Sequence, residues 1–147
     1  MELESLARLA VQKSNPASHA AARPEQGYPF AVVSGGDLAR LDPTPMWQAL
    51  LCDLADGVPA TAIALRFHHG FAEACAGLAR DLARQHRAGA IALSGGVMQN
   101  ALLMERLQAR LAHCGLPVQT QRQVPANDGG LAHGQAVIAA ARMMEGR

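Results

Sequence analysis

The order of apolar runs in the second half of the chain predicts an α/β fold. A short run, Ala90–Leu93, precedes a helical pattern of leucines that stops near Gly115. A second run, Val118–Thr120, precedes a final helical pattern from about Leu131 to Met144. The short runs have the length of strands, and the longer patterns have the spacing of helices. This β-α-β-α order implies parallel strands joined by right-handed crossover connections.

The first part of the chain predicts a helix, a loop and a β-hairpin. Met1–Gln12 has apolar residues at helical spacing, and Ser14–Gly27 is rich in small and polar residues with proline. Apolar runs on both sides of the turn Ser34–Asp37 predict a hairpin, and Pro29 would put its first strand at an edge.

Two helices should follow the hairpin. Asp42–Pro45 introduces the first helix, Asp56–Gly57 closes it, and Pro59 starts the second. The large apolar residues of the second helix recur at helical spacing, which predicts that they form its buried face. They are Ile63, Phe67, Phe71, Cys75, Leu78 and Leu82.

Composition limits the domain count and the class of partner. With 147 residues, of which 50% are hydrophobic, the chain has enough apolar material for one domain, 1–147, in which 1–27 is an N-terminal helix and loop. The 13 Lys and Arg residues nearly balance the 12 Asp and Glu residues. Nucleic acid and anionic membranes are therefore not expected partners. Aromatic residues make up only 3%, which argues against a platform for stacking bases.

Cysteine usage and hydropathy indicate a cytoplasmic protein. Cys52, Cys75 and Cys114 are odd in number, widely spaced and free of any Cys-x-x-Cys pair, so neither a disulfide framework nor a zinc finger is expected. No apolar stretch approaches the roughly 20 residues that cross a bilayer.

Ser94-Gly95-Gly96 is the strongest candidate for a ligand site. A glycine pair between a strand and a helix brings backbone N–H groups, with no Cβ in the way, to the positive end of a helix dipole, where a nucleotide or another anion can bind. The alternative is a tight turn without a ligand. Asn100, in the first helical turn, could reach back to the ligand, or it could be a solvated or capping amide.

Asn127-Asp128-Gly129-Gly130 repeats this arrangement before the last helix and adds a carboxylate that could hold a metal ion. In the alternative, Asn127 or Asp128 simply caps the helix. Capping needs one such residue and no paired glycines, so the pattern favours a ligand.

Other reactive side chains carry weaker signals. His68 and His69 are adjacent on a helix and point about 100° apart, so we expect one core-facing and one solvent-facing imidazole rather than a metal site. Ser94 lacks the Gly-x-Ser-x-Gly pattern of hydrolases. No cysteine lies at a glycine turn that opens a helix.

The glycine turns and their surroundings resemble the C-terminal end of the HypF family of hydrogenase maturation carbamoyltransferases. The similar segments are Leu93–Asn100, Leu102–Glu105, Val124–Gly130 and Gly134–Ala136, with Tyr28–Phe30 and Arg66–His68 upstream. The resemblance covers nearly the whole chain.

The resemblance implies one lobe of an actin-like ATPase (ribonuclease H-like) fold, with an edge hairpin plus β-α-β-α, as in the related TsaD-type enzymes. Family members form carbamoyl-adenylate from carbamoyl phosphate and ATP. They then transfer the carbamoyl group to the C-terminal cysteine of the partner HypE, for synthesis of the cyanide ligand of NiFe hydrogenase. The residues that would contact the nucleotide or shape its pocket are Ser94, Gly95, Gly96, Asn100, Asn127, Gly129 and Gly130. Asp128 would bind a divalent metal, iron or magnesium.

The family's acylphosphatase-like domain, zinc fingers, YrdC-like domain and first actin-like lobe, which supplies a metal-binding His pair, are not in this sequence. We therefore expect a fragment or truncated relative of an enzyme, inactive in isolation. A non-catalytic scaffold or dimerising stand-alone lobe, and an unrelated α/β phosphate-binding module, are the alternatives. The stripe Leu3, Leu6 and Leu9, which has no evident partner, is the predicted surface of a homodimer.

Overall fold

The computed structural model describes residues 2–13, 26–35 and 38–146. Most of the predicted loop 14–27 and the tip of the hairpin turn lie outside these residues. The elements are α1 (Glu2–Lys13), β1 (Ala31–Gly35), β2 (Leu38–Asp42), α2 (Thr44–Ala55), α3 (Ala60–Gln85), β3 (Ile91–Leu93), the 3-10 helix η1 (Gly96–Gln99), α4 (Ala101–Leu111), β4 (Val118–Thr120) and α5 (Asp128–Met144).

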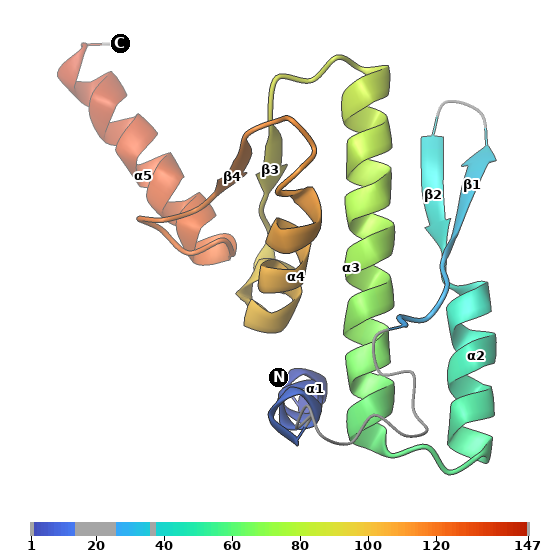
Figure 1. The fold of residues 1–147 in the computed structure, drawn as a ribbon. Helices are drawn as coiled ribbons and strands as arrows, with labels where there is room; N and C mark the ends of the chain where they lie inside the picture. Colours follow the sequence, from blue (N-terminus) through green and yellow to red (C-terminus); the bar gives the residue numbers. More distant parts are fainter. Residues whose placement is uncertain (1, 14–25, 36–37, 147) are drawn as a thin grey trace.

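The long helix α3 stands at the centre of the molecule, and α1, α2 and α4 pack against it (Figure 1). The hairpin β1–β2 lies on one side of α3, and the β3–β4 pair lies on the other. None of the described helices combines the length and apolarity that a membrane span requires.

Both predicted strand pairings are confirmed. Strands β1 and β2 are antiparallel, with Ala31 opposite Asp42. Strands β3 and β4 are parallel, with Leu93 opposite Thr120. In the described part of the chain the two pairs form separate two-stranded sheets. Pro29 precedes β1 and so does not lie within a strand.

The main core lies between α3, α4 and β3. The α4 side chains Leu103, Leu107 and Leu111 are at most 2% exposed, and each contributes roughly 1.5–3 kcal/mol by its burial. They pack against small residues of α3, including Ala72 and Ala76, which are fully buried. Small side chains on α3 allow its backbone to approach α4 closely.

The predicted buried face of α3 is therefore partly wrong. Leu82 is 37% exposed, and Phe67 and Phe71 are only partly buried. His68 and His69 are both buried, at 2% and 8% exposure, so the expectation of one solvent-facing imidazole is also wrong. The segments that pack closely against α3 leave room for small side chains only, and they also cover its polar residues His68 and His69.

One of those neighbours is the backbone just before β1. A Cβ on Gly70, in the middle of α3, would lie 2.1 Å from the Tyr28 carbonyl oxygen. A Cβ on Gly27 would lie 2.1 Å from the Gly70 amide nitrogen. The two backbones therefore cross in contact, and each needs glycine at the crossing.

Tyr28 is anchored at this crossing by a polar cluster. Its hydroxyl donates to the Asp53 carboxylate of α2 at 2.5 Å, the Arg66 guanidinium pairs with the same carboxylate, and Arg66 lies 4.6 Å from the centre of the Tyr28 ring. Burial, together with the bond to Asp53, raises the pKa of the Tyr28 hydroxyl, which stays protonated as a donor. The cluster ties the segment before β1 to α2 and α3.

The two terminal helices differ in how they pack. Helix α1 packs against α3 through the fully buried Ala7, so it has a partner, contrary to the expectation from its leucine stripe. Leu3 and Leu9 are 45% and 44% exposed. Helix α5 has no buried residue and extends away from the other elements (Figure 1).

Candidate functional site

The predicted site begins where the parallel strands β3 and β4 end. Ser94 follows β3, and Gln121 follows β4. Because Leu93 pairs with Thr120, the two following residues are neighbours at the carboxyl edge of the sheet. The Gln121 side-chain amide donates a hydrogen bond to the Ser94 hydroxyl, with 2.8 Å between Nε2 and Oγ. Ligands of α/β proteins commonly bind at this edge.

The glycine pair leaves room above the backbone. Gly95 has φ +100°, a conformation that favours glycine. Among the described residues, a Cβ on Gly96 would meet nothing within 4 Å, and both glycines are exposed. The described part of the chain therefore leaves the space over Gly96 open. Gly96 is also the first residue of η1, where a backbone N–H has no acceptor within the helix.

The helix after the glycine pair starts later than the sequence predicted. The 3-10 helix η1 comes between the glycines and α4, and Asn100 is the N-cap of α4 rather than a residue of its first turn. The Asn100 Oδ1 accepts a hydrogen bond from the Leu103 amide at 2.9 Å. Capping, the alternative role for Asn100, is thus observed.

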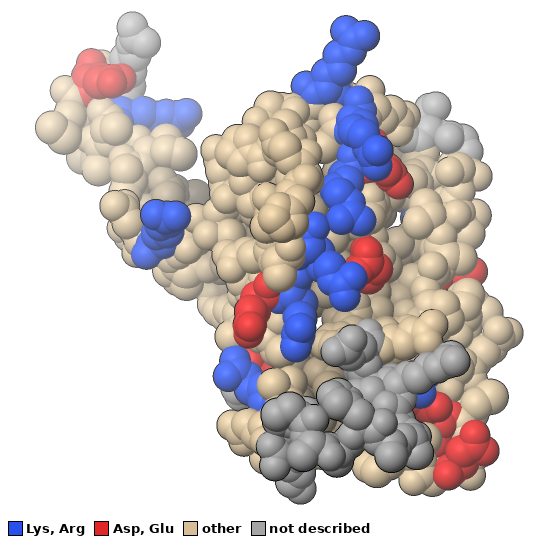
Figure 2. Space-filling view, in the orientation of Figure 1, with Lys and Arg blue, Asp and Glu red and all other residues tan. Residues whose placement is uncertain are grey.

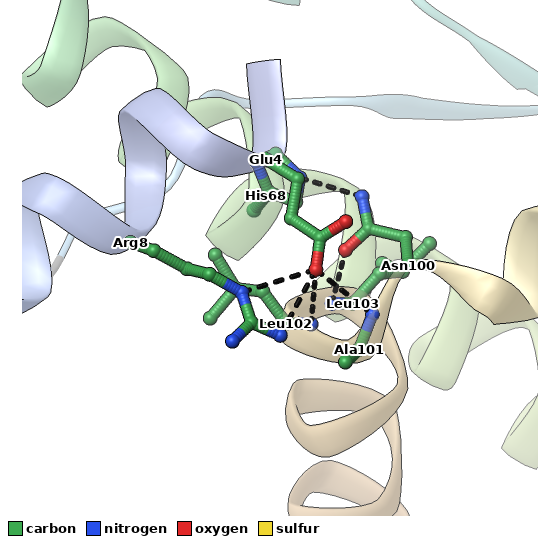
Figure 3. Close-up of polar contacts among 7 residues, drawn as sticks. All are labelled: Glu4, Arg8, His68, Asn100, Ala101, Leu102 and Leu103. Atoms are coloured by element: carbon green, nitrogen blue, oxygen red, sulfur yellow. Dashed lines mark hydrogen bonds and ion pairs between the residues drawn. The ribbon is translucent and has the colours of Figure 1, made fainter. Parts of the chain in front are cut away.

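A carboxylate from α1 occupies the positive end of α4 (Figure 3). The Glu4 Oε1 accepts hydrogen bonds from the amides of Ala101, at 3.1 Å, and Leu102, at 3.4 Å, and it pairs with Arg8 at 3.0 Å. Together, Glu4 and Asn100 satisfy the first three amides of α4. The first three amides of α4 are therefore not available to an incoming anion, whereas the N–H of Gly96 has no acceptor within η1.

Asn100 is held from its other side by α3. Its Nδ2 lies 2.9 Å from Nε2 of the buried His68 (Figure 3). Nδ1 of His68 lies 2.8 Å from the Ala64 carbonyl oxygen. Since the carbonyl can only accept, Nδ1 carries a proton and Nε2 accepts from the Asn100 amide. This chain of bonds fixes the orientation of the Asn100 side chain beside the glycine turn.

The second motif forms the start of α5. Asn127 is the N-cap, and its Oδ1 accepts from the Gly129 amide at 3.0 Å, so the capping alternative holds for Asn127. Helix α5 begins at Asp128, three residues before the predicted start at Leu131. A Cβ on Gly130 would lie 2.1 Å from the Pro125 carbonyl oxygen. The local backbone therefore explains Gly130, so a glycine there does not by itself indicate a ligand.

Asp128 lies in the first turn of α5 and is exposed. Among the described residues, no group of three or more His, Cys, Asp or Glu side chains is placed to hold a metal ion. One carboxylate is not a metal site by itself, since a divalent cation takes several ligands. The described residues alone do not fit the expected metal.

Basic side chains gather elsewhere, in a column over α3 and α4 (Figure 2). Arg80 and Arg110 both pair with Glu73, and Arg84 pairs with Asp81, so much of this charge is balanced locally. A hollow of about 350 Å³ here is lined by Arg80, Arg84, His113, Cys114 and Leu116. A second hollow of about 350 Å³ includes Tyr28, His69 and Arg110 in its lining. No predicted site residue lines either hollow.

Three residues at the site were not predicted: Gln121, Glu4 and His68. A signal existed for Gln121, because residues that follow paired parallel strands meet at the same edge. For Glu4, 97 residues before Ala101, local patterns carry no signal.

Comparison with known proteins identifies the family. Residues 1–135 match the family model described as the second subdomain of the carbamoyltransferase Kae1-like domain. The chain is 42% identical over 103 residues to carbamoyltransferase HypF of Rhodobacter capsulatus, covering 70% of this chain and 13% of that protein. It is 41% identical over 90 residues to a carbamoyltransferase HypF homologue of Cupriavidus necator, covering 61% of this chain and 23% of that one.

Solved structures agree. Full-length HypF, crystallised in a phosphate- and nucleotide-bound form, matches 94% of this chain with TM-score 0.75 and 30% identity, over 16% of its own length. T. kodakarensis HypF matches 99% of this chain with TM-score 0.69 and 26% identity, over 17% of its own length. The chain thus spans less than a quarter of each of these relatives. Its mixed α/β fold, its glycine turns and these matches together show that it belongs to the HypF carbamoyltransferase family.

Proposed function

We propose that this chain supplies the nucleotide-binding wall of an ATP-dependent carbamoyltransferase. The observation that carries the proposal is the exposed turn Ser94–Gly96 at the carboxyl ends of β3 and β4, with open space where a Gly96 Cβ would stand. Phosphate oxygens are acceptors and need donors that approach without steric hindrance. Backbone amides at the glycine turn and the Ser94 hydroxyl provide such donors.

The other predicted residues have supporting roles in this proposal. Asn100, held by His68 and the Leu103 amide, forms a rigid border beside the turn. Asn127, Gly129 and Gly130 shape the start of α5, where Asp128 would contribute one oxygen ligand to a divalent metal. The remaining metal ligands would come from outside the described residues. That a family relative was crystallised with phosphate and nucleotide bound supports a nucleotide in this family.

For the reaction, we propose the family's chemistry: ATP, carbamoyl phosphate and water give carbamoyl-adenylate, pyrophosphate and phosphate. The carbamoyl group then passes to the C-terminal cysteine thiol of HypE, and AMP is the leaving group. This chain would act together with the other parts of such a protein. Two features support a cooperating partner. The parallel sheet has two strands in the described part of the chain, which is marginal alone, and the apolar helix α5 has no buried residue. The exposed face of α5 equally favours the alternative of a dimerising scaffold.

Calorimetric titration of the 147-residue chain with Mg·ATP tests the nucleotide site. We expect Gly96→Val, which fills the open space with a branched side chain, to abolish binding while the fold remains. Gly89→Val is the matched control, because Gly89 also has open space around it but precedes β3, at the opposite end of the strand. Equal ATP affinity of the wild-type chain and both variants, or absence of ATP binding by the wild type, would contradict the proposal.

A further inference from the structure

We propose that Gln121 is a positioning residue of the nucleotide site, which orients the Ser94 hydroxyl as a donor toward a phosphate oxygen. The inference rests on the proposed function above. It concerns the sheet edge at which the two parallel strands end.

The contact between Gln121 and Ser94 follows from the register of the sheet. Leu93 and Thr120 are partners, so the next residue of each strand stands beside the other. The Gln121 Nε2 donates to the Ser94 Oγ at 2.8 Å, and both residues are exposed. This bond links the ends of β3 and β4 through side chains, and it lies directly before the glycine pair.

The direction of the hydrogen bond determines what Ser94 can offer a ligand. A hydroxyl has one proton and two lone pairs, whereas a side-chain amide nitrogen can only donate. When the amide of Gln121 fills one lone pair of Ser94, the hydroxyl proton points elsewhere and is available to an acceptor. Phosphate oxygens are acceptors, and a hydrogen bond to a charged oxygen is stronger than a neutral one. Gln121 thus prepares Ser94 for an anionic phosphate group.

Glutamate at this position would reverse the arrangement. An ionised carboxylate accepts the Ser94 proton, so the hydroxyl would present a lone pair to the phosphate. Methionine has a similar length and cannot donate. Gln121→Met therefore tests the loss of the Ser94 hydroxyl orientation, and Gln121→Glu tests its reversal.

A double-mutant cycle of Gln121→Met and Ser94→Ala tests the proposal, with Mg·ATP affinity measured by calorimetry and Tm measured for each variant. We expect Gln121→Met to weaken ATP binding about tenfold with Tm unchanged, because the Ser94 hydroxyl is no longer held in the orientation that donates to the charged phosphate oxygen. In the Ser94→Ala background, Gln121→Met should have no further effect. Gln121→Glu should weaken binding more than Gln121→Met, and Gln119→Glu serves as the charge control on the same strand.

The outcomes separate this inference from the proposed function. If Gly96→Val abolishes ATP binding but Gln121→Met does not change it, the role of Gln121 is wrong and the nucleotide site stands. An equal loss from Gln121→Met in both backgrounds would show that Gln121 does not act through Ser94. A wild-type chain that binds no ATP would overturn both proposals.

Discussion

His68 and Asn100, 32 residues apart in the chain, are joined by a hydrogen bond of 2.9 Å that links the middle of α3 to the start of α4. The side chain that donates this hydrogen bond, Asn100, caps α4 and also borders the glycine turn. Asn100 therefore combines a capping role with a fixed position beside the proposed nucleotide site.

Replacement of Asn100 by alanine should be strongly destabilising. It removes the cap, which costs about 1 kcal/mol, and leaves Nε2 of the buried His68 without a donor, which costs about 1–3 kcal/mol. Asn100→Ser keeps a capping hydroxyl but loses the contact to His68, so its cost should be smaller. Urea unfolding of the wild type and the two variants measures the free-energy costs of losing the cap and of losing the His68 contact. Equal stability of the alanine variant and the wild type would show that neither bond matters.

Glu4 should make the stability of the chain depend on acid pH. Burial opposes ionisation of the Glu4 carboxyl, but the bonds from Arg8 and the Leu102 amide, with the charge of Arg8, hold its pKa below the ordinary value of 4.5. A carboxyl with a lowered folded-state pKa stabilises the fold above its unfolded pKa, and that contribution is lost as pH falls through the folded pKa.

The measurement compares the wild type with Glu4→Gln between pH 6 and pH 3. We expect the wild type to be more stable at pH 6, and the difference should shrink as Glu4 becomes protonated near and below pH 4.5. Glu105→Gln, on the exposed side of α4, is the control for removing one carboxylate. A difference that is independent of pH would contradict the role of the ionised Glu4.

The close crossing of backbones at Gly70 predicts that glycine-to-alanine substitutions at two positions of α3 change the stability in opposite directions. Gly70→Ala places a Cβ 2.1 Å from the Tyr28 carbonyl oxygen and should cost about 3 kcal/mol or more. Gly77→Ala meets only the Arg80 guanidinium at 4.0 Å and should stabilise by up to about 1 kcal/mol, because alanine favours the helix. Thermal unfolding monitored by circular dichroism distinguishes them. If Gly70→Ala leaves the melting temperature unchanged, the Tyr28 backbone does not contact α3 at Gly70.

These residues also show what the sequence could predict. The alternation of strands and helices, and the parallel pairing of β3 and β4, follow from local apolar patterns and were confirmed. The small residues that α3 buries, such as Ala72 and Ala76, could not be predicted in this way, because the close approach of α4 selects them. The carboxylate of Glu4 at the start of α4 is a long-range contact, and short-range spacing carries no information about it.

Asp128 leads to a prediction about metal binding. A single exposed carboxylate leaves most coordination positions of a divalent ion to water, so the free chain should bind Mg²⁺ or Fe²⁺ weakly. Asp128→Asn should remove the binding that remains, whereas Asp56→Asn, in an exposed turn, should not. Equilibrium dialysis measures this. Tight stoichiometric metal that survives Asp128→Asn would show that the site lies elsewhere.

Self-association should depend on α5 more than on α1. Helix α5 exposes Val137 and Ile138 by more than half and Met143 and Met144 by more than 80%. An apolar helix without a buried face commonly packs against another surface. Helix α1, by contrast, already packs against α3 through Ala7, and Leu3 is 45% exposed.

We therefore expect a concentration-dependent dimer of the isolated chain that forms through α5. Light scattering over a concentration series should give a mass that rises toward twice 15.4 kDa. Ile138→Glu should keep the chain monomeric, because a carboxylate at the centre of an apolar contact loses its hydration without a partner. Leu3→Glu should leave the dimer intact. If Leu3→Glu dissociates the dimer and Ile138→Glu does not, α1 forms the contact; a wild-type chain that is monomeric throughout would show that α5 tolerates its exposure.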